Sequence, residues 1–450
     1  MRFRFASSFV AAALIVWAAP THGQFLTTDA RRIGMAGMSL DRSGDLSRYN
    51  MAYRAAPPRT GTRKAKVTIP IPLGLIQFFR DHPISDLGDD PLFHPDSAAF
   101  NPVELANLLL NPPLFLEVKK APTPTNDVEF TIGQNELIID LGEAQVLIPS
   151  DEFGFGGQSR LLDLGFGFKG VSVGVMGWVH HDVGFRLGDS LRAVLKAGVP
   201  VDPNARYNLL ADVTGQTGFA PFVAYAGRVA GDTVRGLYAG AAVRLYLGAA
   251  YGHVDGSVGF ITSDPIFGAP GPTEDVSATA RYSRFGNSLG TGFGGDVGMV
   301  YVSGPVEFGL GVNDIGAKLT WSDTRVDSTY WDAAGDSVVS TLLANHVESE
   351  TEIPTSYIAN VALSLGTRTT VGGNILYNGR RTTIHVGGEQ RMGLVALRGG
   401  VARDGRKKLQ VGFGGGVLLG SLSLDVGFWT HSNSFSDERG ITMATSVSIY

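Results

Sequence analysis

The chain has 450 residues, of which 60 are glycine, about twice the share of an average soluble protein. Aromatic residues make up 10% and charged residues only 18%, which excludes a solvated disordered chain. The count of cysteines is 0, which excludes disulfides, thiolate metal sites and a cysteine nucleophile. The formal net charge of −5 gives no reason to expect a nucleic-acid partner.

The first 23 residues have the three parts of an export signal. Two arginines precede an apolar run over residues 5–17, and a stretch of small residues up to Gly23 suits cleavage before Gln24, with a cut after Ala19 as the alternative. The apolar run is shorter than the roughly 20 residues of a membrane-spanning helix. We therefore expect residues 1–23 to be a signal peptide and the mature chain to be exported.

From residue 161 onward, segments of roughly 10 residues alternate between apolar and polar or glycine positions, as in membrane β-barrels. In residues 420–430, for example, one face carries an aliphatic and aromatic series and the other carries serine, aspartate and glycine. The apolar series is Leu422, Leu424, Val426 and Phe428, and the opposite series is Ser421, Ser423, Asp425 and Gly427.

Alternation alone is also compatible with a soluble β-sandwich. The length of the segments, the density of glycine on the face opposite the apolar one, and the export signal favour the membrane. We predict an all-β fold in which residues 61–450 form a transmembrane antiparallel β-barrel. A count of the alternating segments from Lys64 onward gives about 14 strands, within two, and an even number is expected for a closed bacterial barrel. The last six strands are expected to form an up-and-down meander, with outer-membrane lipid and the barrel assembly machinery as partners.

Three segments interrupt the alternation. Residues 87–124 are rich in Pro, Asn and Asp, and we interpret them as an inserted loop with a short helix over 103–110. Residues 323–352 are polar and acidic, and we interpret them as a long extracellular loop. A second short helix is expected over 189–198.

The residues after the signal resemble a known family. Asp29-Ala30-Arg31-Arg32-Ile33-Gly34-Met35-Ala36-Gly37-Met38 precedes an acidic patch and Tyr49-Asn50-Met51-Ala52, as at the N-terminus of the long-chain fatty acid transporter (FadL-like) superfamily. Met51 stands where proline is usual in that family. Residues 291–321 and 387–400 look like paired strands of its PorV-like branch.

The resemblance implies that residues 24–60 fold into the barrel lumen as a hatch, in which Gly34, Met35, Gly37, Tyr49 and Asn50 belong to the motif. Glycines in the hatch and on the lumen face allow the two backbones to approach closely. Because methionine does not fix φ as proline does, the turn at residue 51 is an open question.

The resemblance also implies a function, with two alternatives. One is passive transport of a hydrophobic or amphiphilic small molecule across the outer membrane. The other, typical of the PorV-like branch, is handling of exported proteins during secretion or surface attachment.

The remaining candidates for chemistry are charged residues on lumen-facing positions. They are interpreted first as ion pairs that hold strands and hatch together, and second as contacts to a ligand head group, for which a guanidinium suits a carboxylate. No cofactor, metal or enzymatic activity is expected, because adjacent His180 and His181 point to opposite faces of a strand and no nucleophile-elbow spacing occurs. The ligand candidates are Arg244, Arg398, His385, Glu389 and Asp296.

Overall fold

The structure is a computed structural model. It describes residues 29–40, 42, 45–59, 67–71, 114–118, 129–133, 136–140, 153–266, 271–283, 289–332, 337–379, 382–403, 409–432 and 439–449. The predicted signal peptide, the helix expected over 103–110 and the terminal Tyr450 lie outside these residues.

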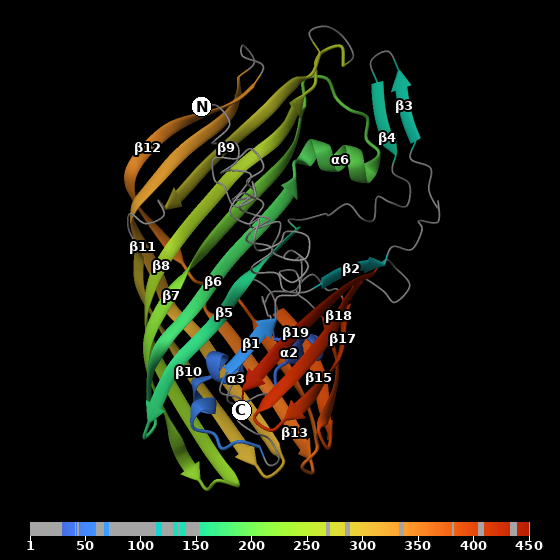
Figure 1. Cartoon of the computed structure of the whole chain (residues 1–450). Helices are drawn as coiled ribbons and strands as arrows, with labels where there is room; N and C mark the ends of the chain where they lie inside the picture. The colour runs from blue at the N-terminus through green and yellow to red at the C-terminus, as the bar shows by residue number, and fades with distance from the viewer. Residues whose placement is uncertain are drawn as a thin grey trace, which may run out of the picture.

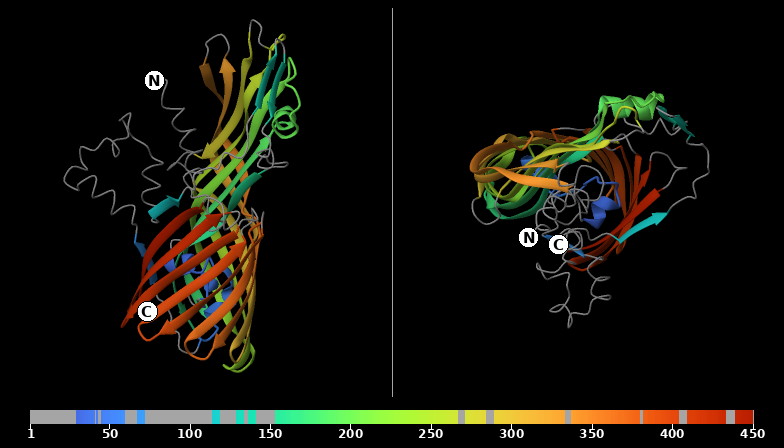
Figure 2. Two further views of the ribbon diagram at one scale, coloured as in Figure 1. Left: turned by 90° about the vertical axis from the view of Figure 1, so that its right-hand side faces the viewer. Right: turned by 90° about the horizontal axis from the view of Figure 1, so that it is seen from above.

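Seventeen strands of the described residues form one antiparallel sheet, and a separate hairpin pairs β3 (Glu129–Gly133) with β4 (Glu136–Asp140). The sheet curves around the interior in the shape of a barrel, and we call it the wall (Figures 1 and 2). Its strands are β1 (Val67–Ile71), β2 (Leu114–Val118), β5 (Phe153–Phe168), β6 (Val171–Leu187), β7 (Arg206–Gly231), β8 (Arg235–Ile261), β9 (Thr273–Ser283), β10 (Gly290–Ser303), β11 (Val306–Asp332), β12 (Ser337–Glu352), β13 (Ser356–Leu365), β14 (Thr369–Tyr377), β15 (Thr382–Met392), β16 (Val395–Arg403), β17 (Leu409–Leu419), β18 (Leu422–Ser432) and β19 (Arg439–Ile449).

Three positions in the wall are each shared by two short strands stacked end to end. β10 pairs with one half of β8, and β9 pairs with the other half. On one edge of β11, β13 pairs with the first part of the strand and β12 pairs with the rest. β1 and β2 likewise share the free edge of β19. The 17 described strands therefore occupy 14 positions across the wall, in agreement with the predicted strand number.

The wall corrects two predictions about loops. Residues 323–352, predicted as a loop, are the upper part of β11 and all of β12, joined by a connection at 333–336. Most of β12 is exposed on both faces, so its sequence lacks the apolar alternation by which a strand is recognised, while the backbone ladder forms regardless. Within the predicted inserted loop 87–124, residues 114–118 form β2.

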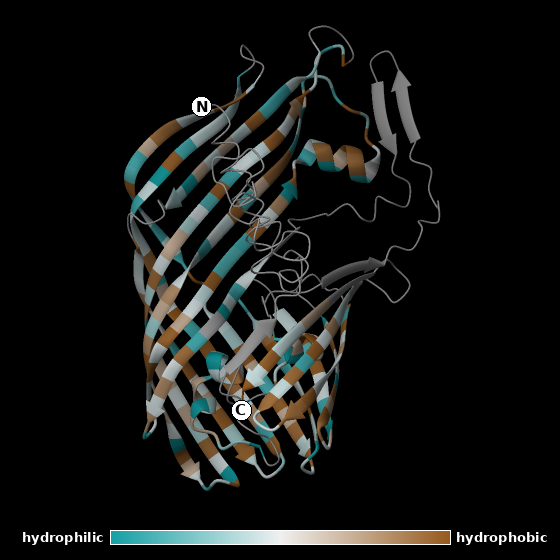
Figure 3. Ribbon diagram, in the orientation of Figure 1, coloured by the Kyte–Doolittle hydropathy of each residue, from teal (hydrophilic) through white to brown (hydrophobic). Residues whose placement is uncertain are grey.

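The predicted alternation appears directly as outward apolar rows. Met299, Leu310, Ala359, Ile375 and Ile384 lie opposite one another across five neighbouring strands. Leu310 is 60% exposed, whereas the adjacent Gly309 and Gly311 are buried. Figure 3 shows this alternation along the strands of the lower part of the wall.

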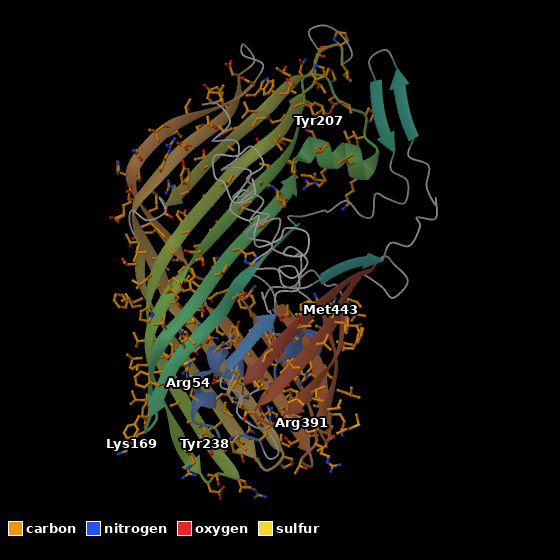
Figure 4. All side chains as sticks on the ribbon, in the orientation of Figure 1. Arg54, Lys169, Tyr207, Tyr238, Arg391 and Met443 are labelled. Carbon is orange, nitrogen blue, oxygen red and sulfur yellow. The ribbon has the colours of Figure 1, made fainter. Side chains whose placement is uncertain are left out.

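The two ends of the wall differ in height. At the lower end, tight turns at glycines with positive φ, such as Gly170, Gly304, Gly366 and Gly420, connect the strands. Figure 4 places Lys169 and Tyr238 at this end and Tyr207 at the upper end. Strands β7, β8, β9, β11 and β12 rise well above β13 to β19, so one side of the molecule is taller (Figures 1 and 2).

Helix α6 (Asp189–Ala197) packs at the upper end, and it confirms the helix predicted over 189–198. It ends at Gly198, which adopts the left-handed conformation. Val194 of this helix joins Val201, Tyr207 and Ile266 in a small buried cluster.

The N-terminal segment lies inside the lower part of the wall, where Figure 1 shows it in blue. We call the described residues 29–40, 42 and 45–59 the hatch. They form helix α2 (Ala30–Ile33), helix α3 (Asp45–Tyr49) and the 3-10 helix η1 (Met51–Arg54). α2 packs on β17, β18 and β19, and η1 packs on β7, β8 and β10.

Candidate functional site

The hatch rests on wall glycines. A Cβ atom at Gly400 would lie 2.5 Å from the carbonyl oxygen of Met35, and one at Gly412 would collide with the backbone of Ala36. A Cβ atom at Gly34 of the hatch would in turn lie 3.2 Å from the Cα atom of Gly414. The expected close approach of two glycine-rich backbones is therefore present, and there is no room for side chains between them.

Asn50 forms the hatch turn that lacks the usual proline. Its side-chain oxygen accepts a 3.1 Å hydrogen bond from the backbone nitrogen of Ala52, which caps η1. Its amide nitrogen donates to the carbonyl oxygens of Met299 and Leu310, each at 3.0 Å. The turn at Met51 is thus held by asparagine hydrogen bonds to two wall strands rather than by a fixed φ.

Glu307 on β11 pairs with two arginines of the hatch. It is 1% exposed and accepts hydrogen bonds from the guanidinium groups of Arg42 and Arg59 and, at 3.1 Å, from the hydroxyl of Tyr53. Asn360 of β13 donates to the same hydroxyl. We call these residues the Glu307 cluster.

Burial shifts the pKa of two hatch groups in this cluster. Removal from water raises the pKa of Tyr53, and the negative charge of Glu307 raises it further. Burial also lowers the pKa of Arg42, against the opposing attraction of Glu307. The phenol is therefore held protonated.

A second cluster lies beside the end of α3. Arg160 of β5 donates to Asp296 at 2.9 Å and to Asp314 at 2.8 Å, and Arg244 of β8 donates to Asp296 at 2.6 Å. Arg160 also donates to the carbonyl oxygen of hatch residue Arg48. We call Arg160, Arg244, Asp296 and Asp314 the Asp296 cluster. Its two positive and two negative groups balance.

The third cluster surrounds Glu389 on β15. Arg398 donates to Glu389 and to Asp425, both at 2.7 Å, and Arg31 of the hatch lies 3.6 Å from Glu389. On the same strand, His385 lies 2.6 Å from the carbonyl oxygen of Ala36 through Nδ1. These contacts join α2 to the C-terminal third of the wall.

The five predicted lumen residues are all buried in these contacts. Arg244 and Asp296 come together in one cluster, Arg398 and Glu389 in another, and His385 contacts the hatch alone. The geometry therefore fits the interpretation that the charges hold strands and hatch together.

Sequence reasoning missed Arg160 and Asp314. Arg160 stands in the part of the chain without recognisable motifs, and Asp314 adopts a positive φ at a point where β10 and β11 lose register. The alternation at Asn313-Asp314 shifts there, which is the only signal the sequence offers of an irregularity.

Above the hatch, aromatic side chains face the interior. Trp178 and Tyr246 meet edge to face at 5.6 Å between ring centroids, and Tyr251 and Trp321 stack at 5.3 Å. They form one buried cluster with Met51 of η1. We call these four rings the aromatic layer.

In the described part of the chain, no group of three or more His, Asp or Glu side chains is placed to hold a metal ion. None of the described helices is long and apolar enough to cross a membrane.

The outer surface completes the architecture. Large apolar side chains are exposed on strand after strand, as on a surface that contacts lipid or a partner. With charged groups turned inward and apolar groups outward, the chain has the architecture of an outer-membrane β-barrel with a helical N-terminal segment in its interior.

Comparison with solved structures finds toluene transporters and porins. The Ralstonia pickettii toluene transporter TbuX is 11% identical, with 68% of this chain and 93% of that chain covered and a TM-score of 0.33. The Pseudomonas putida toluene transporter TodX is 13% identical, with 69% and 93% covered and a TM-score of 0.32. A mutant porin of Rh. blastica is 12% identical, with 62% and 100% covered and a TM-score of 0.20. No protein-family model and no curated protein matches the sequence.

Proposed function

We propose that this protein is a passive outer-membrane transporter of hydrophobic or amphiphilic small molecules, with the hatch as its gate. The observation that carries the proposal is the aromatic layer, which faces the interior directly above η1. A channel for hydrated solutes needs a polar lumen. An aromatic layer, in contrast, favours transfer of an apolar molecule from water into an apolar environment.

The hatch contacts support a gating role. The hatch is seated by hydrogen bonds, ion pairs and backbone contacts, while the ladder hydrogen bonds of the wall connect wall strands to each other. Movement of the hatch would therefore leave the wall's own pairing intact. The outward apolar rows would remain in contact with lipid throughout.

The test is uptake by cells whose outer membrane carries the protein. Cells that express the full chain should take up a labelled aromatic hydrocarbon faster than cells without it, and should take up a labelled hydrophilic sugar no faster. Deletion of residues 29–60 should add permeability to the sugar. Hydrocarbon uptake equal to that of cells without the protein would reject the transport proposal. The protein-handling alternative then becomes the one to test, by looking for exported proteins that co-purify with the chain.

A further inference from the structure

Four buried nitrogen atoms on β5 and β6 lack hydrogen-bond partners in the described part of the chain. They are Nε2 of Gln158, Nε of Arg160, Nε1 of Trp178 and Nδ1 of His180. All four side chains are more than nine-tenths buried. Buried polar groups in proteins nearly always have a hydrogen-bond partner, so four unpartnered nitrogens close together require an explanation.

The strand register places these side chains in one patch. Gln158 lies directly opposite His180, and Arg160 lies directly opposite Trp178 two residues further along. Residues opposite each other in an antiparallel pair share a face of the sheet. That face is the interior, because Arg160 contacts the hatch at Arg48 and Tyr49. We call the four residues the donor patch.

The unpartnered nitrogens of the donor patch share one hydrogen-bonding role. The nitrogens of Gln158, Arg160 and Trp178 are hydrogen-bond donors, and Nδ1 of His180 donates in the tautomer that carries its proton there. The missing partner is therefore an acceptor, such as an oxygen. Trp178 also belongs to the aromatic layer, so an apolar body bound there would have its oxygen at the patch.

The charges nearby decide between a neutral and an anionic acceptor. Arg160 is paired with Asp296 and Asp314, and Arg244 with Asp296, so the cluster has no unbalanced positive charge to offer. An additional buried anion would find no unbalanced positive charge to attract it and would lose its hydration without compensation. A neutral oxygen incurs neither penalty.

We propose that the donor patch and the aromatic layer form a binding site for uncharged apolar compounds that carry a carbonyl-type oxygen. This inference rests on the proposed transport function and narrows its substrate class. Gln158, Trp178 and His180 hydrogen-bond the oxygen, while Trp178 and its aromatic neighbours contact the apolar body.

The test compares three probes on the full chain in detergent, by equilibrium dialysis. Acetylnaphthalene has the neutral oxygen, naphthoate has an anionic head, and methylnaphthalene has no oxygen; all three are substituted at the same ring carbon. Gln158→Leu and His180→Phe each remove one partner of the oxygen. Gln410→Leu is the matched control, because Gln410 is also buried with an unpartnered Nε2 but lies on β17.

We expect acetylnaphthalene to bind the native chain at least about tenfold tighter than naphthoate. Each patch variant should weaken acetylnaphthalene about fivefold, the effect of one hydrogen bond, and leave methylnaphthalene unchanged. Gln410→Leu should change neither probe. Measuring each variant against the native chain with the same probe cancels partition into the detergent.

The outcomes separate the two proposals. If both patch variants change the affinities for acetylnaphthalene and methylnaphthalene equally, or if naphthoate binds tightest, the donor patch does not select a neutral oxygen. Buried water molecules would then be the hydrogen-bond partners of its nitrogens. If none of the three probes binds the native chain, the transport proposal fails instead.

Discussion

At the scale of single residues, the hatch depends on a few wall carboxylates. Glu307 receives two arginines and a tyrosine from the hatch, and Glu389 receives Arg31. A buried ion pair adds little to stability when it forms, but removal of one partner leaves the other charge buried without compensation. The docking of the hatch should therefore respond strongly to changes at these carboxylates.

Replacement of Glu307 by glutamine should release the hatch while the wall stays folded. Two buried arginines would lose their counter-charge, at a cost of about 3 kcal/mol, which raises the undocked population roughly 100-fold. Because the chain has 0 cysteines, a single Ser39→Cys substitution in the hatch gives a clean labelling site. The labelling rate by a water-soluble maleimide measures the undocked state. Glu350→Gln on exposed β12 is the control, and equal rates in both variants would contradict the assignment.

Tyr53 should remain protonated in strongly alkaline solution. Its pKa is raised in the folded state, so its contribution to docking is complete below the pKa of an exposed tyrosine, about 10, and is lost only as the pH rises toward the folded value. In an ultraviolet titration up to about pH 11, Tyr53→Phe should therefore show the same tyrosinate absorbance as the native chain. A deficit of one tyrosine would show that Tyr53 is accessible to water.

At the scale of elements, the seat of the hatch is made by backbone rather than by side chains. Gly412 on β17 and Gly400 on β16 touch the turn after α2, where no Cβ fits. The neighbouring Gly399 points to the other side, and a Cβ there would meet nothing within 4 Å. The two kinds of wall glycine give a matched pair of substitutions.

Gly412→Ala should displace α2, because the new Cβ collides with the backbone of Ala36 and Ile33. Gly399→Ala should have an effect within about 0.5 kcal/mol, as is usual for surface substitutions. Both variants can be compared by maleimide labelling at Ser39→Cys. If the Gly399→Ala variant were labelled faster than the Gly412→Ala variant, docking of the hatch would depend on the wall as a whole and not on the glycines that contact the hatch.

The elements also show what sequence patterns can resolve. Alternation gave the faces of β13 to β18 and the turns between them, because each strand there has one side toward the interior and one outside. It failed on β12, where both faces are exposed, and it missed the full length of β8, which runs for 27 residues. Period-two patterns report a difference between two environments, and they vanish where the environments are alike.

At the scale of the whole molecule, the arrangement of the ion-pair clusters was beyond prediction. Inward charges such as Asp296 and Arg244 were identified, but their partners depend on which strands lie side by side and in which register. Arg160 and Asp296 are in contact although 136 positions separate them in the sequence, and Arg59 and Glu307 are separated by 248 positions. No local pattern records such distances.

The wall predicts a characteristic behaviour on a denaturing gel. Barrels whose strands pair across long stretches unfold slowly in detergent, so the unboiled protein should run at a different apparent mass from the boiled protein. Gly412→Ala and Glu307→Gln should keep this difference, since both act on the hatch. Identical mobility of boiled and unboiled native protein would count against a membrane barrel.

The position of the hatch in the chain has a consequence for biogenesis. The hatch is synthesised before the wall, yet Ala36 docks on His385, 349 positions later, and Gly34 on Gly414. These wall contacts cannot form until the last third of the chain has paired, so the hatch reaches its native contacts after the strands that follow it in the sequence. Until then the arginines of the hatch lack their carboxylate partners, so docking of the hatch is expected to be a late step in the assembly of this protein.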